Sequence, residues 1–308
     1  MDRAKFIEAL RKLPVPDLRC PGYPPKQRST KDWEIPILHV SDTQWGKRTR
    51  TYNSDVARKR MFDLALHAGK VIDARKSFAR IEEARLYLGG DIVEGQDVFK
   101  GQAHHIDSTV QAQAIHGASS ALARLALRVL SHVRKLHVVV VGGNHGDTVD
   151  ETVNWDEVCY EVMKRDLLGG ADLYPERKKV MQRITFAPIG PWYHVDKVFG
   201  WGNLIVHGHQ FKGSFIGSGF KNKVSGWIDA IPEPWDYIWF GHYHTLGMGV
   251  MNRRIYLANG TTESDNDWAQ EHCAATGHPV QRLATFNEKY GLVSDYPLYL
   301  NARRANKK

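Results

Sequence analysis

Cysteine is scarce in this sequence. Only three cysteines occur among 308 residues, they lie far apart, and no two form a Cys-x-x-Cys pair. Three cysteines cannot all pair, and a chain of this length buries enough apolar surface to be stable without disulfide bonds. The scarcity argues against a disulfide scaffold and favours a reducing compartment, which we expect to be the cytoplasm.

Long apolar runs are also missing. The longest runs, such as residues 136–141, are far shorter than the roughly 20 residues that a membrane-spanning helix needs. The N-terminus, residues 1–8, carries charges where a signal peptide has an apolar core. We therefore expect neither secretion nor insertion into a membrane.

Acidic residues are outnumbered by basic ones. Lys and Arg number 42 and Asp and Glu number 34, so the formal net charge is +8. A positive charge favours polyanionic partners, because each cation that neutralises a phosphate releases a counterion. Many basic proteins bind no nucleic acid, so the charge only supports what other residues indicate. With 42% hydrophobic residues, the composition is that of a soluble globular protein.

The chain divides into three parts. Residues 1–34 contain a short helical pattern that Pro14 ends, followed by a polar, turn-rich stretch, and we expect an N-terminal extension there. Residues 35–300 form the predicted domain. Residues 301–308 are a polar, basic tail that we expect to fray. No internal repeat or low-complexity tract occurs.

Five short apolar runs in the domain predict strands that are buried on both faces. The runs are 35–40, 85–88, 136–141, 204–206 and 237–240. Between them, apolar residues at intervals of three or four predict amphipathic helices over 122–136 and 155–163. Strands that alternate with helices indicate a layered α/β fold.

Side chains suited to binding metals follow each of these five runs. They are Asp42, Asp91, Asn144 with His145, His207, and His242 with His244. In open α/β sheets, ligands bind beyond the carboxyl ends of the strands, so we expect these side chains to converge on one pocket. Their oxygen and imidazole donors suit Mn, Fe, Mg or Zn. One ion needs three or four donors, so six or more indicate two ions.

The order of these motifs resembles that of the calcineurin-like metallophosphoesterase superfamily, whose pattern is Asp-x-His, Gly-Asp, Gly-Asn-His-Asp/Glu, a lone His and Gly-His-x-His. The matching stretches here are Asp42-Thr-Gln44, Gly90-Asp91, Gly143-Asn-His-Gly146, His207 and Gly241-His-Tyr-His244. All five occur in order across roughly residues 36–262, each after a predicted strand. The resemblance implies an α/β fold, a four-layer sandwich of two mixed β-sheets flanked by helices.

The resemblance also implies two divalent ions, of which Mn fits best, while Mg, Fe or Zn also suit the donors. The implied ligands are Asp42, Asp91 and His244 for one ion, and Asp91, Asn144, His207 and His242 for the other. A hydroxide that bridges the ions would attack the phosphorus in line, and His145 would protonate the leaving oxygen.

The chain departs from the family pattern at three positions. Gln44 replaces the histidine of Asp-x-His, and its amide oxygen would bind an ion more weakly and favour Mn or Mg over Zn. Gly146 replaces the acid that usually follows His145, which leaves open what orients that imidazole. Glu94 stands where the protein Ser/Thr phosphatases have an Asp that pairs with the catalytic histidine, so we expect a pair of Glu94 and His145.

Three features favour DNA as the substrate. Lys47, Arg48 and Arg50 follow the first motif closely enough to contact a phosphate backbone. Nine tryptophans occur, several of them within 192–239, and those not in the core are candidates for stacking on bases. The stretch 90–102 resembles part of the small subunit of the archaeal D-family DNA polymerase, a 3′–5′ exonuclease, and phage-type DNA exonucleases have similarly compact chains. We therefore expect a two-metal phosphodiesterase that acts as a DNA nuclease, and specifically as an exonuclease.

Two other functions stay open from the sequence. A phosphomonoesterase of the same fold would act on protein, nucleotide or small phosphates. A non-catalytic scaffold with a degenerate site is favoured by Gln44 alone, and the retained metal-binding residues speak against it. Two further histidines have ordinary interpretations: we expect His39 to pack in the core, and we prefer His207 to His209 as a ligand because His207 ends its strand.

Overall fold

A computed structural model describes most of the chain. The described residues are 5, 8, 12, 21–22, 24–26, 32–148, 152–169, 176–213, 215–265 and 278–301. Most of the predicted N-terminal extension, residues 302–308 of the predicted tail, Cys20 and Cys273 lie outside them. Within these ranges, no helix has both the length and the apolar character needed to cross a membrane.

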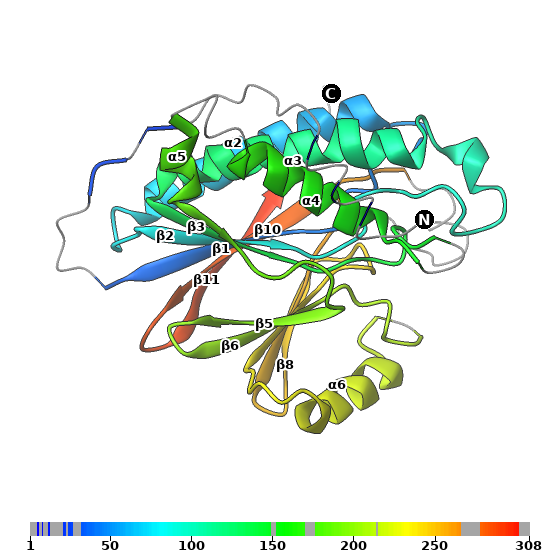
Figure 1. Ribbon diagram of the computed structural model, residues 1–308. Helices are drawn as coiled ribbons and strands as arrows, with labels where there is room; N and C mark the ends of the chain where they lie inside the picture. The colour runs from blue at the N-terminus through cyan, green and yellow to red at the C-terminus, as the bar shows by residue number, and fades with distance from the viewer. Residues whose placement is uncertain are drawn as a thin grey trace, which may run out of the picture.

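Two mixed β-sheets form the centre of the fold (Figure 1). In sheet order, the larger one contains β11 (Gly291–Tyr299), β10 (Val280–Asn287), β1 (Glu34–Val40), β2 (Glu83–Leu88), β3 (Lys135–Val140) and β4 (Ile184–Phe186). The smaller one contains β5 (Tyr193–Val198), β6 (Trp201–Val206), β7 (Tyr237–Phe240), β9 (Arg254–Ala258) and β8 (Gly247–Met251). Strands β1 to β4 are parallel, as are β6, β7 and β9, and the remaining strands pair antiparallel.

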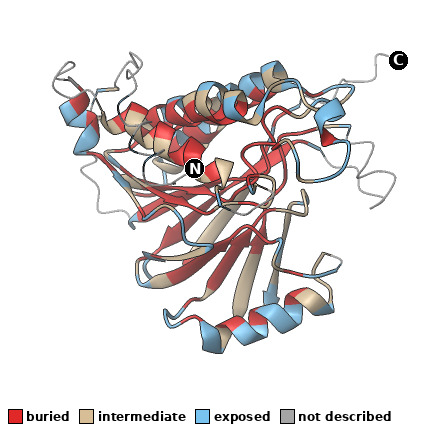
Figure 2. Cartoon of the chain, turned by 45° about the vertical axis from the view of Figure 1, so that its right-hand side comes forward, coloured by how far each residue is buried: buried red, intermediate tan, exposed pale blue. Residues whose placement is uncertain are grey.

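Helices cover the outer face of each sheet (Figures 1 and 2). Those on the six-stranded sheet are α2 (Ser54–Arg75), α3 (Ser119–His132), α4 (Trp155–Leu168) and α5 (Glu176–Met181). The five-stranded sheet carries α6 (Ser218–Ala230). A 3₁₀ helix (Gln102–His105) and a π-helix (Ala112–Ala118) precede α3. The predicted α/β sandwich of two mixed sheets flanked by helices is confirmed.

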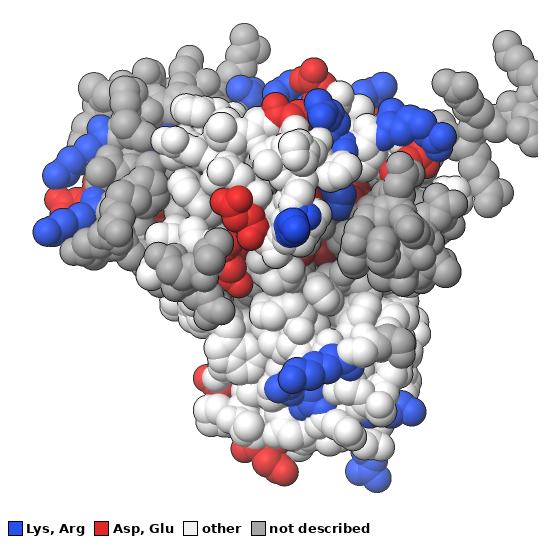
Figure 3. Space-filling view, turned by 90° about the vertical axis from the view of Figure 1, so that its right-hand side faces the viewer, with Lys and Arg blue, Asp and Glu red and all other residues white. Residues whose placement is uncertain are grey.

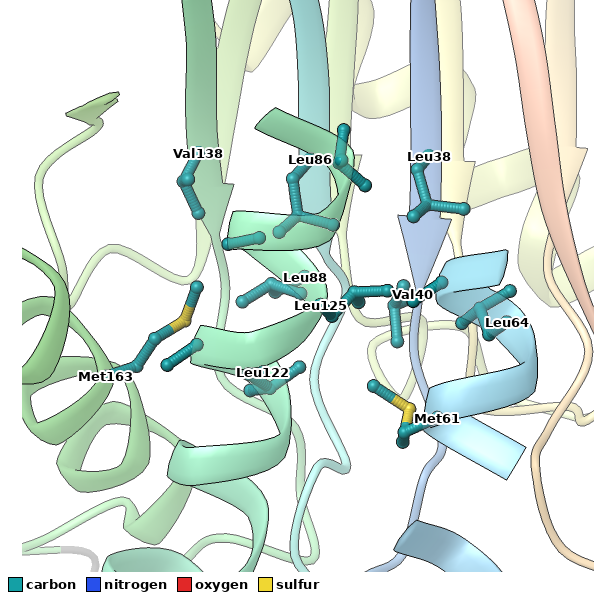
Figure 4. Close-up of a cluster of buried hydrophobic side chains, with 14 of the residues drawn as sticks. Leu38, Val40, Met61, Leu64, Leu86, Leu88, Leu122, Leu125, Val138 and Met163 are labelled. Carbon is teal, nitrogen blue, oxygen red and sulfur yellow. The ribbon is translucent and has the colours of Figure 1, made fainter. Parts of the chain in front are cut away.

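Strand β1 shows why the apolar runs lack alternation. Leu38 and Val40 belong to the apolar cluster under the helices. There they lie beside Met61 and Leu64 of α2 (Figure 4). Ile37 points the other way, into the cluster between the two sheets. Because successive side chains of a strand point to opposite faces, a strand covered on both sides is apolar throughout.

The amphipathic pattern predicted over 122–136 is shorter in the structure. Leu122 and Leu125 of α3 face the sheet (Figure 4), and Val129 is buried with them. The helix ends before Val133, and Leu136 belongs to β3. Both residues are buried, so the apolar spacing continues across the helix end into a strand that packs in the same cluster.

His39 packs between the sheets, as predicted. Its side chain is fully buried and stands edge-on to Trp239 of β7, with ring centroids 5.6 Å apart. Neither ring nitrogen has a hydrogen-bond partner among the described residues. Burial, helped by the charges of Arg282 and His207, lowers the pKa of His39 to about 3, so the imidazole is neutral.

Candidate metal centre

The site forms where strand ends of the two sheets meet. Asp42 and Asp91 follow β1 and β2 of the larger sheet, and His207 and His242 follow β6 and β7 of the smaller one. His207 Nδ1 donates to the Gly89 carbonyl at 2.8 Å. The His242 backbone N–H donates to Asp42 Oδ1 at the same distance. The predicted convergence therefore uses both sheets, and these two hydrogen bonds connect them.

Asp91, His207 and His242 offer one group of metal-ligand atoms that all lie within 4.8 Å of one another. His207 Nε2 is 3.1 Å from Asp91 Oδ2. Because the Gly89 carbonyl engages Nδ1, the ring presents Nε2 to the site, as metal-binding histidines commonly do. His209 is exposed and lies outside this group. Carboxylate and imidazole donors at this spacing suit a divalent ion.

Two buried oxygens beside this group also fit an ion. Asp42 Oδ2 and Asn144 Oδ1 have no hydrogen-bond partner within the part of the chain that the structure describes. Leaving a buried polar atom without a partner costs about 1–3 kcal/mol. Two such oxygens that lie among histidines are suited to bind a cation.

The charge of Asp91 dominates the electrostatics of this group. Burial opposes its ionisation, but His207 and His145 outweigh burial and hold the pKa of Asp91 well below its usual range. Burial likewise opposes charge on His207, and Asp91 overcomes it to raise the pKa of His207 to about 9. Burial and the charge of His207 lower the pKa of His242 to about 4. His242 is thus ready to ligate, whereas a metal must displace a proton from His207.

Asp42, Gln44 and His244 form the other half of the predicted site. Asp42 Oδ1 lies 3.4 Å from His244 Nε2, and Gln44 Nε2 lies 3.4 Å from the same nitrogen. His244 Nδ1 donates to Glu263 Oε1 at 2.7 Å. Burial opposes its charge, but Glu263 and Asp42 raise the pKa of His244 to about 10. Among the described residues, this half does not form a second group of three converging carboxylate and imidazole ligands.

Lys47 points into this half of the site. Its Nζ lies 2.8 Å from Gln44 Oε1, 2.8 Å from Glu263 Oε2 and 3.8 Å from Glu94 Oε2. Only 11% of its side chain is exposed. Burial opposes the charge, but Glu263 and Glu94 raise the pKa of Lys47 above its ordinary value. The structure thus places Lys47 inside an acidic cluster, where sequence reasoning had expected a surface contact.

Arg48 and Arg50, in contrast, lie on the surface. Arg48 donates to the His104 carbonyl at 3.0 Å, and Arg50 lies 3.4 Å from a carboxylate oxygen of Asp265. Their role in binding a phosphate backbone stays a prediction. Among the tryptophans from 192 to 239, Trp192 is exposed, and the buried ones are Trp227, Trp235 and Trp239.

The predicted pair of Glu94 and His145 is brought together. His145 Nδ1 donates to the backbone carbonyl of Glu94 at 2.8 Å and lies 3.4 Å from its carboxylate oxygen Oε2. Gln102 Nε2 fixes Glu94 by donating to its carbonyl at 2.7 Å and to Oε1 at 3.1 Å. Burial opposes charge on His145, but Asp91 and Glu94 raise its pKa to about 9. The imidazole therefore holds a proton at neutral pH, and Nε2 lies 4.0 Å from Asp91 Oδ2.

Asp156 supports the site and was not expected to. Its Oδ1 accepts the backbone N–H groups of Ile92 and Val93, each at 3.0 Å, and its Oδ2 accepts that of Gly143 at 2.9 Å. These bonds join the loops that carry Asp91 and the Asn-His motif. Burial and Asp91 raise the pKa of Asp156 to about 7. Acidic residues are common in the first turn of a helix, so the sequence did not indicate that the Asp156 side chain points into the protein.

Glu263 is the second carboxylate that sequence reasoning missed. It follows β9, is 3% exposed and joins His244 to Lys47. The rule that located the other residues, a polar side chain after a buried strand, also applies here. Glu263 escaped notice because β9 was not predicted.

Several of the predicted site residues at the strand ends also have a strained backbone. Five of them have φ in the left-handed region: Asp42 (53°), Gln44 (41°), Asp91 (50°), His242 (67°) and His244 (52°). A non-glycine residue there costs roughly 1–2 kcal/mol, and such strain gathers at functional sites. Neighbouring glycines allow the close packing, since a Cβ on Gly143 would lie 2.1 Å from Asp91 Oδ1, and one on Gly241 would lie 2.2 Å from Asp42 Oδ2.

No family model and no curated protein matches this sequence. Among solved structures, vacuolar protein sorting 29 from Cryptosporidium parvum is similar, with 12% identity over 86% of this chain and 100% of that chain and a TM-score of 0.40. Zn²⁺-complexed vacuolar protein sorting 29 from Entamoeba histolytica has 12% identity over 87% and 100% of the chains and a TM-score of 0.37. An archaeal phosphodiesterase has 12% identity over 85% and 99% and a TM-score of 0.36. Because these values are low, function has to be inferred from the site, and the resemblance to DNA exonucleases stays a prediction.

Proposed function

We propose that the protein is a metal-dependent phosphodiesterase that cleaves DNA. The observation that carries this proposal is the group formed by Asp91, His207 and His242, with ligand atoms within 4.8 Å of one another. His145 lies beside it and holds a proton at neutral pH. These donors would hold a divalent ion, for which Mn is well suited, and the ion would supply positive charge and an activated water for attack on phosphorus.

His145 is the proposed general acid. The Glu94 carbonyl engages Nδ1, which leaves Nε2 directed toward Asp91 and the site. Asp91 and Glu94 raise the pKa of His145 to about 9, which favours the protonated form that a general acid requires. Glu94 acts as a positioning residue, since its carbonyl and carboxylate both face the imidazole.

A cavity of about 830 Å³ between α2 and α3 supports a polynucleotide substrate. Its charged and aromatic lining residues include Trp45, Asp55, Arg58, Lys59, Phe62, Arg124 and Arg128. Four cations against one acid, Asp55, which pairs with Arg58, favour a polyanion, and Phe62, which is 64% exposed, offers a ring face for a base. Trp45 directly follows Gln44, so the cavity adjoins the loop that leads into the site. On the face shown in Figure 3, basic side chains form separate groups with acidic ones between them, so this cavity is the more specific indication.

The direct test is digestion of labelled single- and double-stranded DNA in the presence of Mn, with Asp91→Asn as the inactive control. We expect wild-type protein to cleave DNA and bis-nitrophenyl phosphate. Activity on the mono-nitrophenyl ester alone would instead identify a phosphomonoesterase. Equal cleavage by Asp91→Asn would reveal a contaminating nuclease, and absence of bound Mn would indicate a scaffold.

The cavity provides a second test. In the double variant Arg124→Ala, Arg128→Ala, the rate of DNA cleavage should fall by a factor about ten times larger than the rate of hydrolysis of the small diester. The reason is that the variant removes two phosphate contacts that only DNA would use. The matched control is Lys221→Ala, Lys223→Ala on α6, where both lysines are exposed. Equal effects of the two double variants on DNA cleavage would contradict a role for the cavity.

A further inference from the structure

Lys47 is a largely buried cation, with 11% of its side chain exposed, in the half of the site where the described residues form no converging group of three carboxylate and imidazole ligands. Lysine is almost never buried unless it is paired. Here Nζ has contacts of 2.8 Å with Gln44 Oε1 and Glu263 Oε2, and a third oxygen, Glu94 Oε2, lies at 3.8 Å. These acceptors come from three separate loops, after β1, β2 and β9, so the ammonium joins segments that are distant in sequence.

Gln44 shows that Lys47 competes with an ion for the same donor. In the family pattern, position 44 is a histidine that binds one of the two ions, and the amide oxygen of Gln44 is the atom that would replace it. That oxygen accepts a hydrogen bond from Lys47, and the amide nitrogen, which cannot ligate a cation, faces His244. An ion bound to Gln44 Oε1 would have to displace the ammonium.

His244 is likewise engaged by protein groups. Glu263 accepts from its Nδ1 at 2.7 Å and binds Lys47 through the other carboxylate oxygen at 2.8 Å. Glu263, which is 3% exposed, thus contacts both His244 and Lys47 directly, so His244 and Lys47 share one carboxylate. In the other half, by contrast, Asp91, His207 and His242 converge within 4.8 Å.

We propose that the ammonium of Lys47 replaces one of the two cations, so that this chain holds a single divalent ion, at Asp91, His207 and His242. The inference rests on the proposed function and specifies how many ions its site holds. Lys47 then provides, as a permanent part of the protein, positive charge that a second ion would otherwise bring to the phosphate. In this proposal Gln44 is a hydrogen-bond partner of Lys47 and not the weak metal ligand that the sequence suggested.

The test is the number and environment of bound Mn ions in the full-length protein. We expect wild-type protein to hold about one Mn per chain at saturation, by metal analysis and calorimetric titration, where a two-metal site holds about two. Electron paramagnetic resonance should show an isolated Mn ion. Two bound ions, or the spectrum of a spin-coupled Mn pair, in wild-type protein would overturn the proposal.

The variant Lys47→Met removes the charge and frees the carboxylate of Glu263 and the oxygen of Gln44. We expect it to bind about two Mn ions per chain with the spectrum of a coupled pair. Arg48→Met, at the exposed neighbouring position, is the matched control and should keep the wild-type count. A folded Lys47→Met protein that still binds one ion would also overturn the proposal.

These outcomes separate this inference from the proposed function. Wild-type protein that binds no Mn contradicts the proposed phosphodiesterase, whereas two ions contradict the role of Lys47 alone. Circular dichroism establishes whether Lys47→Met folds. Should it not fold, the stoichiometry and spectrum of wild-type protein decide the question by themselves.

Discussion

The two sheets contribute different chemistry to one site. The loops after the six-stranded sheet supply Asp42, Gln44, Asp91, Asn144 and His145, and those after the five-stranded sheet supply His207, His242 and His244. The six-stranded layer thus supplies most of the carboxylate and amide oxygens, with Glu263 after β9 of the other sheet as the exception, and all but one of the imidazoles come from the five-stranded layer. Neither layer alone holds a complete set of ligands, so binding of metal and packing of the two sheets depend on each other.

The layers also differ in how well they are covered. Among the described residues, four α-helices pack on the larger sheet, whose strand β1 is buried throughout, whereas only α6 covers the smaller one (Figure 2). At the edge of the smaller sheet, Met248 and Val250 of β8 are 52% and 72% exposed. Sparse burial lowers local stability, so the imidazole side is the more easily disturbed part of the site.

Asp91→Asn should have the largest effect, because Asp91 serves both layers. Its Oδ1 accepts the His145 backbone N–H at 2.9 Å, and its Oδ2 faces His207 at 3.1 Å. We expect loss of bound Mn and a fall in DNA cleavage of about 10³-fold or more. Mn content and cleavage rate measure the effect. Asp229→Asn, on the exposed face of α6, is the control, and full Mn content in Asp91→Asn would contradict the assignment.

His145→Gln should affect chemistry on the carboxylate side and leave the imidazole side intact. Removing a general acid lowers turnover by about 10²–10⁴-fold. Glu94→Gln should lower it by about 10–100-fold, since the Glu94 carbonyl continues to hold the ring. Both variants should bind as much Mn as wild-type protein. Loss of Mn from either one would mean that the residue belongs to the metal site.

The affinity for Mn should rise with pH, because of the imidazole side. The pKa of His207 is about 9, so below that pH its ring holds a proton that Mn must displace. Raising the pH removes this proton, and affinity should increase by up to about tenfold per pH unit and level off above about pH 9. His242, with a pKa of about 4, adds no change in this range. Calorimetric titrations at several pH values measure the slope, and a flat profile would contradict the assignment.

His39→Phe should have the smallest effect, on the contact between the layers. The pKa of His39 is about 3 in the folded protein and near 6.5 in an unfolded chain. Between these values the unfolded state binds more protons, so the free energy of unfolding of wild-type protein falls as pH falls from about 6.5 toward 3. The variant lacks this loss, so at pH 5 its stability relative to wild-type protein should be about 2 kcal/mol greater than at neutral pH. Urea unfolding at acid and neutral pH measures the difference; an equal pH slope in both proteins would show that His39 titrates normally.

Much of the carboxylate and imidazole arrangement could be predicted from the sequence. Runs such as 35–40 and 237–240 are apolar throughout because their strands are covered on both faces, so their ends were easy to locate. Each end carries a polar residue that a turn alone does not require. Asp91 and His207 were therefore expected at one pocket from the sequence, the structure brings them together, and their binding of a metal stays a prediction.

Other parts could not be predicted, for physical reasons. Four of the eight buried residues of helix α2 are small, namely Ala57, Ala65, Ala68 and Gly69, so its apolar face is weak in the sequence. Strands β10 and β11 are long but contain polar residues, for example Gln281, whose side chain is buried by hydrogen bonds instead of apolar contact. Lys47 stands in a polar loop, where lysine normally extends into water, and its direction depends on Glu263, over two hundred residues away.

The left-handed backbone at Asp42, Asp91 and His242 has a consequence for how this protein can change. Glycine adopts that conformation without strain, so replacing any of these residues by glycine should relax the loop even as it removes a ligand. Under selection for stability alone, random mutation would therefore replace the ligands at the strand ends first, while the stability of the fold increased. The charged and imidazole side chains at these positions therefore stand against the preference of the backbone.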